Sequence, residues 1–517
     1  MRLLLINPSF PESFWTFRWA VREILPDVRA TNPPLGLATL AALTPAHWQV
    51  TIVDENIELL PLDPAADIVG ICGMGVQYDR QKELAEHYRV RGYRVVVGGS
   101  YASLCPEKFA DAADTVIAGE AEYIWPQFCR DVEAGEAGPL YRETGNVDLA
   151  DSPVPRFDLL RLGRYANASM QYSRGCPYRC EFCDIIVMFG RRPRTKSSLQ
   201  VGRELDVLRE QNVRRVFFVD DNLIGNRPQA RILLEFLADY QRRHGYTFSF
   251  GTEVSLNVAR DAELLNLLRA ANFTWLFIGI ETTDEESLRE ARKIQNVGGD
   301  ILEDVRRVYA AGIDVLAGFI VGFDQDTLAT FDHQRDFIVR SGIQSAMVGL
   351  LQAMPRTPLH ERMRKEGRLR DLDEQCNNNT RAGTNIVPRN MDYQAMVDHY
   401  EQLCRDLSDD DLIAERIGNK LRFMRRPLYA GGYSPQTSLR IVWRLLTRGI
   451  LPGGPRRWLA FLRTLRTANR RQLPTVISDW IIGLSMADFA RRRFTASRTD
   501  ARRSGRGLTA LREAAGR

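Results

Sequence analysis

Short apolar runs alternate with amphipathic segments along the first 145 residues. The runs have the length of buried strands, and the segments between them have the periodicity of helices. Predicted strands span residues 3–6, 49–53, 68–71, 94–97 and 115–118, and predicted helices include residues 35–43 and 80–91. This alternation is typical of an α/β fold, a doubly wound, Rossmann-like parallel sheet whose ligand crevice lies beyond the carboxyl ends of the strands.

The alternation resumes in residues 146–372. Predicted strands span residues 171–173, 216–219, 247–251, 275–280, 314–321 and 345–351. Predicted helices span residues 199–211, 228–243, 261–271, 284–292, 299–311 and 326–341. Repeated strand–helix units with parallel strands predict a complete or partial barrel, with the functional groups at the carboxyl ends of its strands.

Residues 373–496 have the pattern of a mostly helical domain, with a break at residues 452–455. Between residues 439 and 465, Trp and Leu alternate with Arg in an amphipathic manner. Such helices can lie in a membrane interface, or they can pack on the barrel with a solvated arginine face. Residues 497–517 are rich in Arg and Ser, so we expect a disordered basic tail.

Charge is distributed unevenly along the 517 residues, whose formal net charge is only +5. Residues 438–517 contain eighteen Arg and no Lys against four acidic residues, a net charge of +14. This region suits an anionic membrane surface. No aromatic stacking platform or recognised motif accompanies the charge, so we expect no nucleic-acid partner.

Cellular location is inferred from three further features. The first residues contain no visible signal peptide, and no run of eighteen apolar residues occurs. Five of the eight cysteines are scattered singly, which indicates a reducing compartment. We expect a cytoplasmic protein, with peripheral contact to a membrane left open.

The other three cysteines, Cys176, Cys180 and Cys183, have C-x3-C-x2-C spacing. A tight loop of this kind can direct three thiolates at three irons of a cubane cluster and leave one iron open for chemistry. A structural zinc site is the alternative. Zinc needs a fourth Cys or His, and the nearest downstream candidates, His244 and Cys376, are far away in the sequence.

The cysteine segment closely resembles the motif of radical S-adenosylmethionine enzymes. The resemblance implies a 4Fe-4S cluster, S-adenosylmethionine at its open iron, and a radical SAM partial (β/α)6 barrel. It also implies an electron donor such as flavodoxin or ferredoxin, which drives cleavage of S-adenosylmethionine to a 5′-deoxyadenosyl radical.

Resemblance also assigns site roles. Phe182 is expected against the adenine, and Asp220 and Asp221 at the amino group of the methionyl moiety. Glu253 and Glu281 are expected to contact the ribose and the carboxylate. Carboxylates accept hydrogen bonds from ammonium and hydroxyl groups, although any single acid could instead cap a helix.

Glycine-rich loops follow the predicted strands of the first domain. Gly98, Gly99, Ser103 and Glu120 together resemble the cobalamin-binding domain that precedes the radical module in one large subclass, which implies bound cobalamin. Asn56 stands where cobalamin-dependent mutases carry a histidine that ligates cobalt. An amide is a poor cobalt ligand, so we expect cobalamin without histidine ligation; alternatively, this stretch is only a turn.

Three further segments, residues 191–197, 220–226 and 384–391, resemble cobalamin-binding radical enzymes with an added carboxyl-terminal domain. That group includes the hopanoid C-2 methylases. The implied function is methylation of an unactivated carbon of a small-molecule or lipid-like substrate, by a radical on the substrate and methylcobalamin. Two alternatives stay open: a non-methylating rearrangement or cyclisation, and a non-enzymatic cobalamin sensor.

Overall fold

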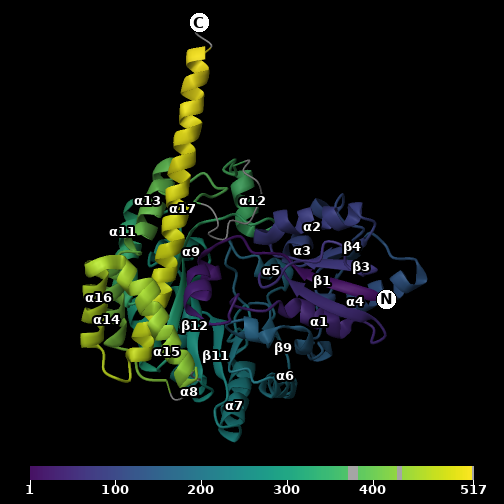
Figure 1. The fold of residues 1–517 in the computed structure, drawn as a ribbon, viewed down its shortest axis with the longest axis horizontal. Coiled ribbons are helices and arrows are strands. Elements are labelled where there is room, and N and C mark those ends of the chain that lie inside the picture. The colour runs from purple at the N-terminus through teal and green to yellow at the C-terminus, as the bar shows by residue number, and fades with distance from the viewer. Residues whose placement is uncertain (371–381, 428–432, 515–517) are drawn as a thin grey trace.

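The structure is a computed structural model that describes residues 1–370, 382–427 and 433–514. Figure 1 shows an amino-terminal α/β domain on the right, a barrel of strands in the centre, and carboxyl-terminal helices on the left. Helix α17 runs along the barrel and projects beyond the body of the molecule. Among the described helices, none combines the length and the apolar character needed to span a bilayer.

The amino-terminal domain contains a parallel sheet with the strand order β2-β1-β3-β4-β5-β6. The strands are β1 (Arg2–Asn7), β2 (Gln49–Asp54), β3 (Ile68–Cys72), β4 (Arg94–Gly98), β5 (Thr115–Ala118) and β6 (Leu140–Arg142). The helices are α1 (Leu35–Leu43), α2 (Tyr78–Val90), α3 (Ser100–Leu104) and α4 (Ala121–Ala134). Alternate residues of β1 enter two different cores, since Leu3 and Leu5 pack with α1 and α4 while Leu4 and Ile6 pack with α2 and α3. The predicted doubly wound sheet is confirmed.

The central domain contains a second parallel sheet, with the order β14-β13-β12-β11-β10-β7. Its strands are β7 (Ala168–Met170), β10 (Arg215–Phe218), β11 (Ser249–Val254), β12 (Phe273–Glu281), β13 (Asp314–Val321) and β14 (Ser345–Leu350). Its helices are α6 (Ser198–Glu210), α7 (Arg227–Arg243), α8 (Ala262–Ala270), α9 (Glu285–Glu290), α10 (Ile301–Ala310) and α11 (Ala329–Ser341). The predicted six-strand partial barrel is confirmed.

The first barrel strand lies earlier than predicted. The sequence predicted a strand at residues 171–173, but β7 ends at Met170. The backbone N–H groups of Tyr172 and Ser173 donate to the Asp220 carboxylate instead of a neighbouring strand. The short strand β8 (Ser173–Arg174) then pairs antiparallel with β9 (Arg194–Thr195), which closes the intervening segment into a loop.

The carboxyl-terminal region is helical, as predicted. It contains α12 (Pro358–Lys365), α13 (Tyr393–Asp406), α14 (Asp410–Leu421), α15 (Pro435–Arg444), a π-helical turn η10 (Leu445–Ile450), η11 (Leu451–Gly453), α16 (Gly454–Thr467) and α17 (Leu473–Ala514). Ile413, Ile417, Phe461 and Trp480 form the core between α14, α16 and α17. The predicted break falls at η11.

Helix α17 continues to Ala514, and the predicted disorder of the basic tail at residues 497–517 stays a prediction. Composition indicated that the tail cannot build a core of its own. It did not exclude a helix, since Ala, Leu, Arg and Glu all favour helical backbone.

Candidate active site

The three cysteines occupy the loop between β8 and the short helix α5 (Ile185–Met188). The Gly175 N–H donates to the Asp221 carboxylate at 2.7 Å, and the Cys176 N–H donates to the Gly190 carbonyl at 3.3 Å. Gly175 has φ +92°, and a Cβ there would lie 3.1 Å from the carbonyl oxygens of Gly190 and Arg192. Both the positive φ and the lack of space for a Cβ require glycine at this position. Gly175 therefore fixes the course of the loop just before the first cysteine.

Two amide side chains lie near the thiols. The Asn222 amide nitrogen lies 4.0 Å from Cys176 Sγ, and that of Gln295 lies 3.5 Å from Cys180 Sγ. Burial raises the pKa of the Cys176 and Cys183 thiols. Hydrogen bonds to the sulfurs tune a thiolate-bound cluster, so these amides suit one. The sequence carried no motif that pointed to Gln295.

The donor set fits a cubane better than a single ion. Within residues 1–370, 382–427 and 433–514, no three His, Cys, Asp or Glu side chains surround one metal-ion position. In a cubane each thiolate binds a different iron, so the thiols need not converge on one point. Of the candidate zinc ligands, His244 packs against Tyr240 at the end of α7, with the ring planes tilted, and Cys376 lies outside the described residues.

Three acids lie beside the cysteine loop: Asp220 is buried, and Asp221 and Glu253 are half-buried. One Asp220 oxygen accepts from Tyr172 N–H at 3.0 Å, while the other is buried without a hydrogen-bond partner among the described residues. Burial raises the pKa of Asp220 to about 7, of Asp221 to about 6 and of Glu253 to about 8. The two aspartates raise the pKa of Glu253 further. A cationic ligand would relieve this repulsion, which suits the predicted binding of an amino group.

Glu281 already has a partner in the structure. It ends β12 with φ +66°, and its carboxylate lies 2.6 Å from Lys293 Nζ. Burial lowers the pKa of Lys293, but Glu281 and Cys180 more than offset this and leave the pKa raised. Lys293 Nζ also lies 5.8 Å from the centre of the Phe182 ring, which packs near Phe323. Glu281 therefore positions a buried cation beside Phe182, and its predicted contact with S-adenosylmethionine stays a prediction.

The glycine loops of the amino-terminal domain approach one another at the carboxyl ends of β3, β4 and β5. Gly99 has φ +102°, and a Cβ there would lie 2.2 Å from the Gly73 carbonyl oxygen. Ser103 Oγ donates to the Gly99 carbonyl and accepts the Gly119 N–H, both at 2.8 Å. Gly98 has only ordinary contacts at its Cβ position. These residues hold the loops close to the carboxyl ends of the strands. A bulky ligand can therefore approach the backbone there.

Asn56 is held in a turn. Its side-chain oxygen accepts Phe10 N–H at 2.8 Å, and its nitrogen donates to Asp54 at 2.6 Å and to the Pro8 carbonyl at 3.2 Å. The turn that the sequence left open as an alternative is present. Both ends of the side-chain amide are engaged within the chain. The expected binding of cobalamin without histidine ligation stays a prediction.

Glu120 links the amino-terminal domain to the cysteine loop. Its carboxylate lies 2.8 Å from both Arg174 and Arg194, and Arg174 also pairs with Glu122 at 2.6 Å. Arg174 directly precedes Gly175 of the cysteine loop. The side chain that sequence resemblance assigned to cobalamin is thus used in buried ion pairs between domains.

The cysteine loop and the glycine loops face each other. Helix α5 begins two residues after Cys183, and α3 begins directly after Gly99. The two helices are in contact, and Met188 packs against the core that contains Tyr101 and Leu104. The carboxyl edges of the two sheets therefore meet, and ligands bound at each edge would be neighbours.

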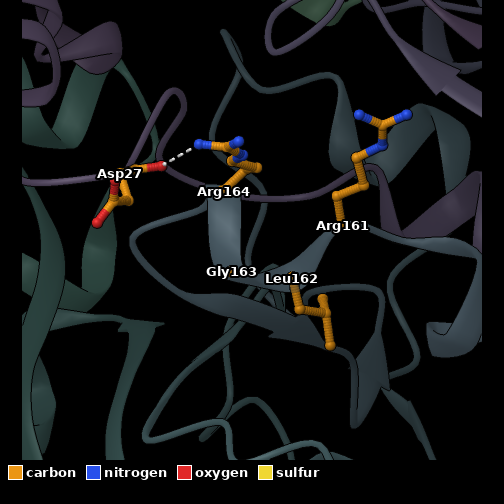
Figure 2. Close-up of a pocket in the computed structure, with 5 residues that line it drawn as sticks. All are labelled: Asp27, Arg161, Leu162, Gly163 and Arg164. Atoms are coloured by element: carbon orange, nitrogen blue, oxygen red, sulfur yellow. Dashed lines mark hydrogen bonds between the residues drawn. The ribbon is translucent and has the colours of Figure 1, made fainter.

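A separate depression of about 450 Å³ is lined by Asp27, Arg161, Leu162, Gly163 and Arg164 (Figure 2). Arg164 donates to the Asp27 carbonyl at 3.4 Å, and Arg161 pairs with Glu58 at 2.7 Å. None of the predicted site residues lines it. It is a surface feature where residues 161–164 meet the loop around Asp27.

Comparison with known proteins extends this geometry. The family model of the Radical SAM superfamily matches residues 170–338, and that of a domain of unknown function, DUF4070, matches residues 357–498. An uncharacterized methyltransferase from Synechocystis sp. is 40% identical over 393 residues, covering 75% of this chain and 73% of that protein. The hopanoid C-2 methylase of Rhodopseudomonas palustris is 37% identical over 375 residues, covering 71% of each chain. The chain belongs to this radical S-adenosylmethionine methyltransferase family.

A solved structure has the same architecture as this radical S-adenosylmethionine enzyme. OxsB, a cobalamin-dependent S-adenosylmethionine radical enzyme solved with aqua-cobalamin and S-adenosylmethionine bound, superimposes with a TM-score of 0.61. The match covers 96% of this chain and 83% of OxsB at 16% identity. At that identity the similarity establishes the fold, including the order of the sheet domain, the barrel and the helices.

Proposed function

We propose that this enzyme methylates an unactivated carbon, with a 4Fe-4S cluster and S-adenosylmethionine at the barrel and cobalamin at the amino-terminal sheet. The contact between α5 and α3 carries the proposal, because it sets the cysteine loop opposite the glycine loops. When bound, these cofactors supply hydrogen-atom abstraction and a methyl group. The enzyme must then hold the substrate carbon between the two edges and exclude water.

The chain's own residues have distinct parts in this scheme. Cys176, Cys180 and Cys183 would hold the cluster. Asp220 and Asp221, whose pKa values are raised, would hold the amino group of S-adenosylmethionine, and Glu253 would contact its ribose or carboxylate. Transfer of label from methyl-deuterated S-adenosylmethionine into a product tests the scheme. Cleavage without methyl transfer would support a rearrangement or cyclisation, and no cleavage would support the cobalamin sensor.

A small or lipid-like substrate fits the family membership, and a reductant such as flavodoxin or ferredoxin is the partner that we expect. The relative from Rhodopseudomonas palustris is named for methylation of a hopanoid. A lipid-like substrate raises the question of how the enzyme meets a membrane.

A face of α15 and η11 supports peripheral membrane contact. Leu439, Trp443 and Leu451 are 71%, 60% and 56% exposed, while Ile441 and Leu445 are buried in the helical core. Exposed Trp and Leu on a basic helix are typical of a side that lies in a membrane interface. Other arginines of the region match the alternative in which its helices pack on the rest of the protein, since Arg448, Arg456 and Arg457 form ion pairs within the chain.

Serine at Leu439, Trp443 and Leu451 should reduce co-sedimentation of the full chain with anionic liposomes. The substitutions remove the apolar anchors and leave the net charge unchanged. A full-length variant is preferable to truncation near Tyr433, which would uncover the core of α14. Binding by the unmodified chain should weaken with salt, because screening acts over about 10 Å at 0.1 M.

The matched control replaces Leu62 and Val90 with Ser, since these apolar side chains of the amino-terminal domain are 58% and 86% exposed. The control should bind liposomes like the unmodified chain. Equal partitioning of all three proteins, or no partitioning by the unmodified chain, would contradict membrane contact through this face.

A further inference from the structure

Interior-facing side chains of the barrel are partly exposed at the level of β12 and β13. Phe277 and Leu316 are half-buried, whereas their strand neighbours Leu276 and Ile278 are fully buried in the core beneath the helices. Successive side chains of a strand point to opposite faces, so the more exposed set faces the interior. A closed eight-stranded barrel fills its interior with packed side chains. Here the interior-facing Phe277 and Leu316 are apolar and only partly covered by the protein, which leaves accessible space beside them.

Aromatic side chains close this space toward the amino ends of the strands. Phe217 and Trp275 stack with ring centres 5.0 Å apart. The Trp275 indole lies over Gly251, where a Cβ would come within 2.0 Å of the ring. Two residues before Phe217 in β10, the Arg215 guanidinium donates to the Tyr433 hydroxyl at 2.7 Å. Phe217 and Trp275 therefore give the interior an aromatic base.

The amino-terminal segment adds a wall that the strands do not supply. The sheet is open between its edge strands β14 and β7. The single turn η1 (Phe14–Thr16) and the π-helical turn η2 (Ala20–Ile24) lie beside α17, as Figure 1 shows in purple in front of β12. Phe14 is buried, with its ring centre 4.4 Å from that of Phe489 on α17.

Trp15 points the other way. Its ring centre lies 4.9 Å from that of Phe277, an interior residue of β12, and it remains 36% exposed. An aromatic ring that packs on an interior residue and keeps part of its surface accessible can contact an apolar ligand.

Ion pairs of residues before and after Trp15 in the chain hold its segment in place. Glu12 pairs with Arg492 of α17 and with Arg18. Glu23 pairs with Arg448 at 3.0 Å. These contacts hold the segment to the carboxyl-terminal helices, so Trp15 enters the barrel on a supported turn.

We infer that Trp15 is a substrate-contacting residue that forms, with Phe277, the wall that selects the size and position of the apolar part of the substrate. The inference rests on the proposed function for the identity of the site, but not on which carbon is methylated. It assigns specificity to a segment that lies about 160 residues before the cysteines in the chain.

The test is equilibrium binding of a labelled hopanoid, presented in detergent micelles, to the cluster-loaded full chain. Trp15→Ala should weaken binding about tenfold, or about 1.4 kcal/mol, because the substitution truncates a packed Trp at a contact. Trp15→Phe keeps an apolar ring and should bind within about threefold of the unmodified chain. Phe423→Ala, which removes a 38% exposed ring outside the barrel, should bind normally.

Equal binding by folded Trp15→Ala and the unmodified chain would overturn the inference, as would failure of the unmodified chain to bind the hopanoid. If Trp15→Ala does not fold, Trp15→Leu gives the same comparison with more of the apolar volume kept. S-adenosylmethionine cleavage and methyl transfer are measured separately on the same proteins. Their failure would count against the proposed reaction and leave the binding result to decide the role of Trp15.

Discussion

Replacement of Cys176, Cys180 or Cys183 by Ala should abolish the iron–sulfur absorption and the formation of 5′-deoxyadenosine. Each thiolate is one of only three protein ligands expected for the cluster, so loss of any one leaves it held at two points. The neighbouring amides of Asn222 and Gln295 cannot substitute, since an amide nitrogen is not a thiolate. Anaerobic reconstitution, absorption spectra and chromatographic measurement of 5′-deoxyadenosine provide the readout.

Cys404→Ala and Cys72→Ala are the matched controls, and both should retain the cluster and the cleavage activity. Burial raises the pKa of Cys404 to about 12 and of Cys72 to about 11, so both are protonated thiols in apolar surroundings. Loss of the cluster in either control, or its retention in a variant of the three-cysteine loop, would refute the ligand assignment.

Arg174→Met should lower the free energy of unfolding by about 3–5 kcal/mol, the usual cost of breaking a buried ion pair from one side. The Arg174 side chain is 12% exposed and pairs with Glu120 and Glu122, which are more deeply buried still. Without it, Glu122 loses its arginine partner, whereas Glu120 keeps Arg194. Because Arg174 adjoins the cysteine loop, reconstituted cluster content should fall as well.

Urea unfolding and iron content measure these effects. Arg191→Met is the control, since Arg191 is exposed and makes no ion pair with any residue that the structure describes. A change in stability for Arg174→Met no larger than that for Arg191→Met would show that the ion pairs do not join the domains.

The sequence predicted most elements because their periodicity is strong. The bounds of α1, β5 and β13 match the expected runs, and the remaining parallel strands of the barrel, apart from β7, differ from them by at most three residues at either end. The strand β7 was misplaced because a tertiary contact, the hydrogen bonds of Tyr172 and Ser173 to Asp220, overrides local propensity. Such a contact has no signature within a sequence window.

The cysteines could be identified from spacing alone, but most of their surroundings could not. Glu120 finds its partners 54 and 74 residues away, and Gln295 reaches Cys180 across 115 residues. The residue types of Glu120 and Gln295 are therefore known from the sequence, but the residues that they contact are not. No sequence motif includes Trp15. Its proposed role depends on its contact with Phe277 of the barrel, which the sequence does not show.

The most direct measurement of the central claim follows the methyl group and the adenosyl group together. The unmodified chain is reconstituted anaerobically with iron, sulfide and cobalamin, then supplied with methyl-deuterated S-adenosylmethionine, a reductant and a hopanoid-containing lipid extract. We predict a product that carries the deuterated methyl group, together with 5′-deoxyadenosine and S-adenosylhomocysteine, and no such product when cobalamin is omitted. Formation of 5′-deoxyadenosine without S-adenosylhomocysteine or labelled product, or formation of labelled product without cobalamin, would contradict the proposed reaction.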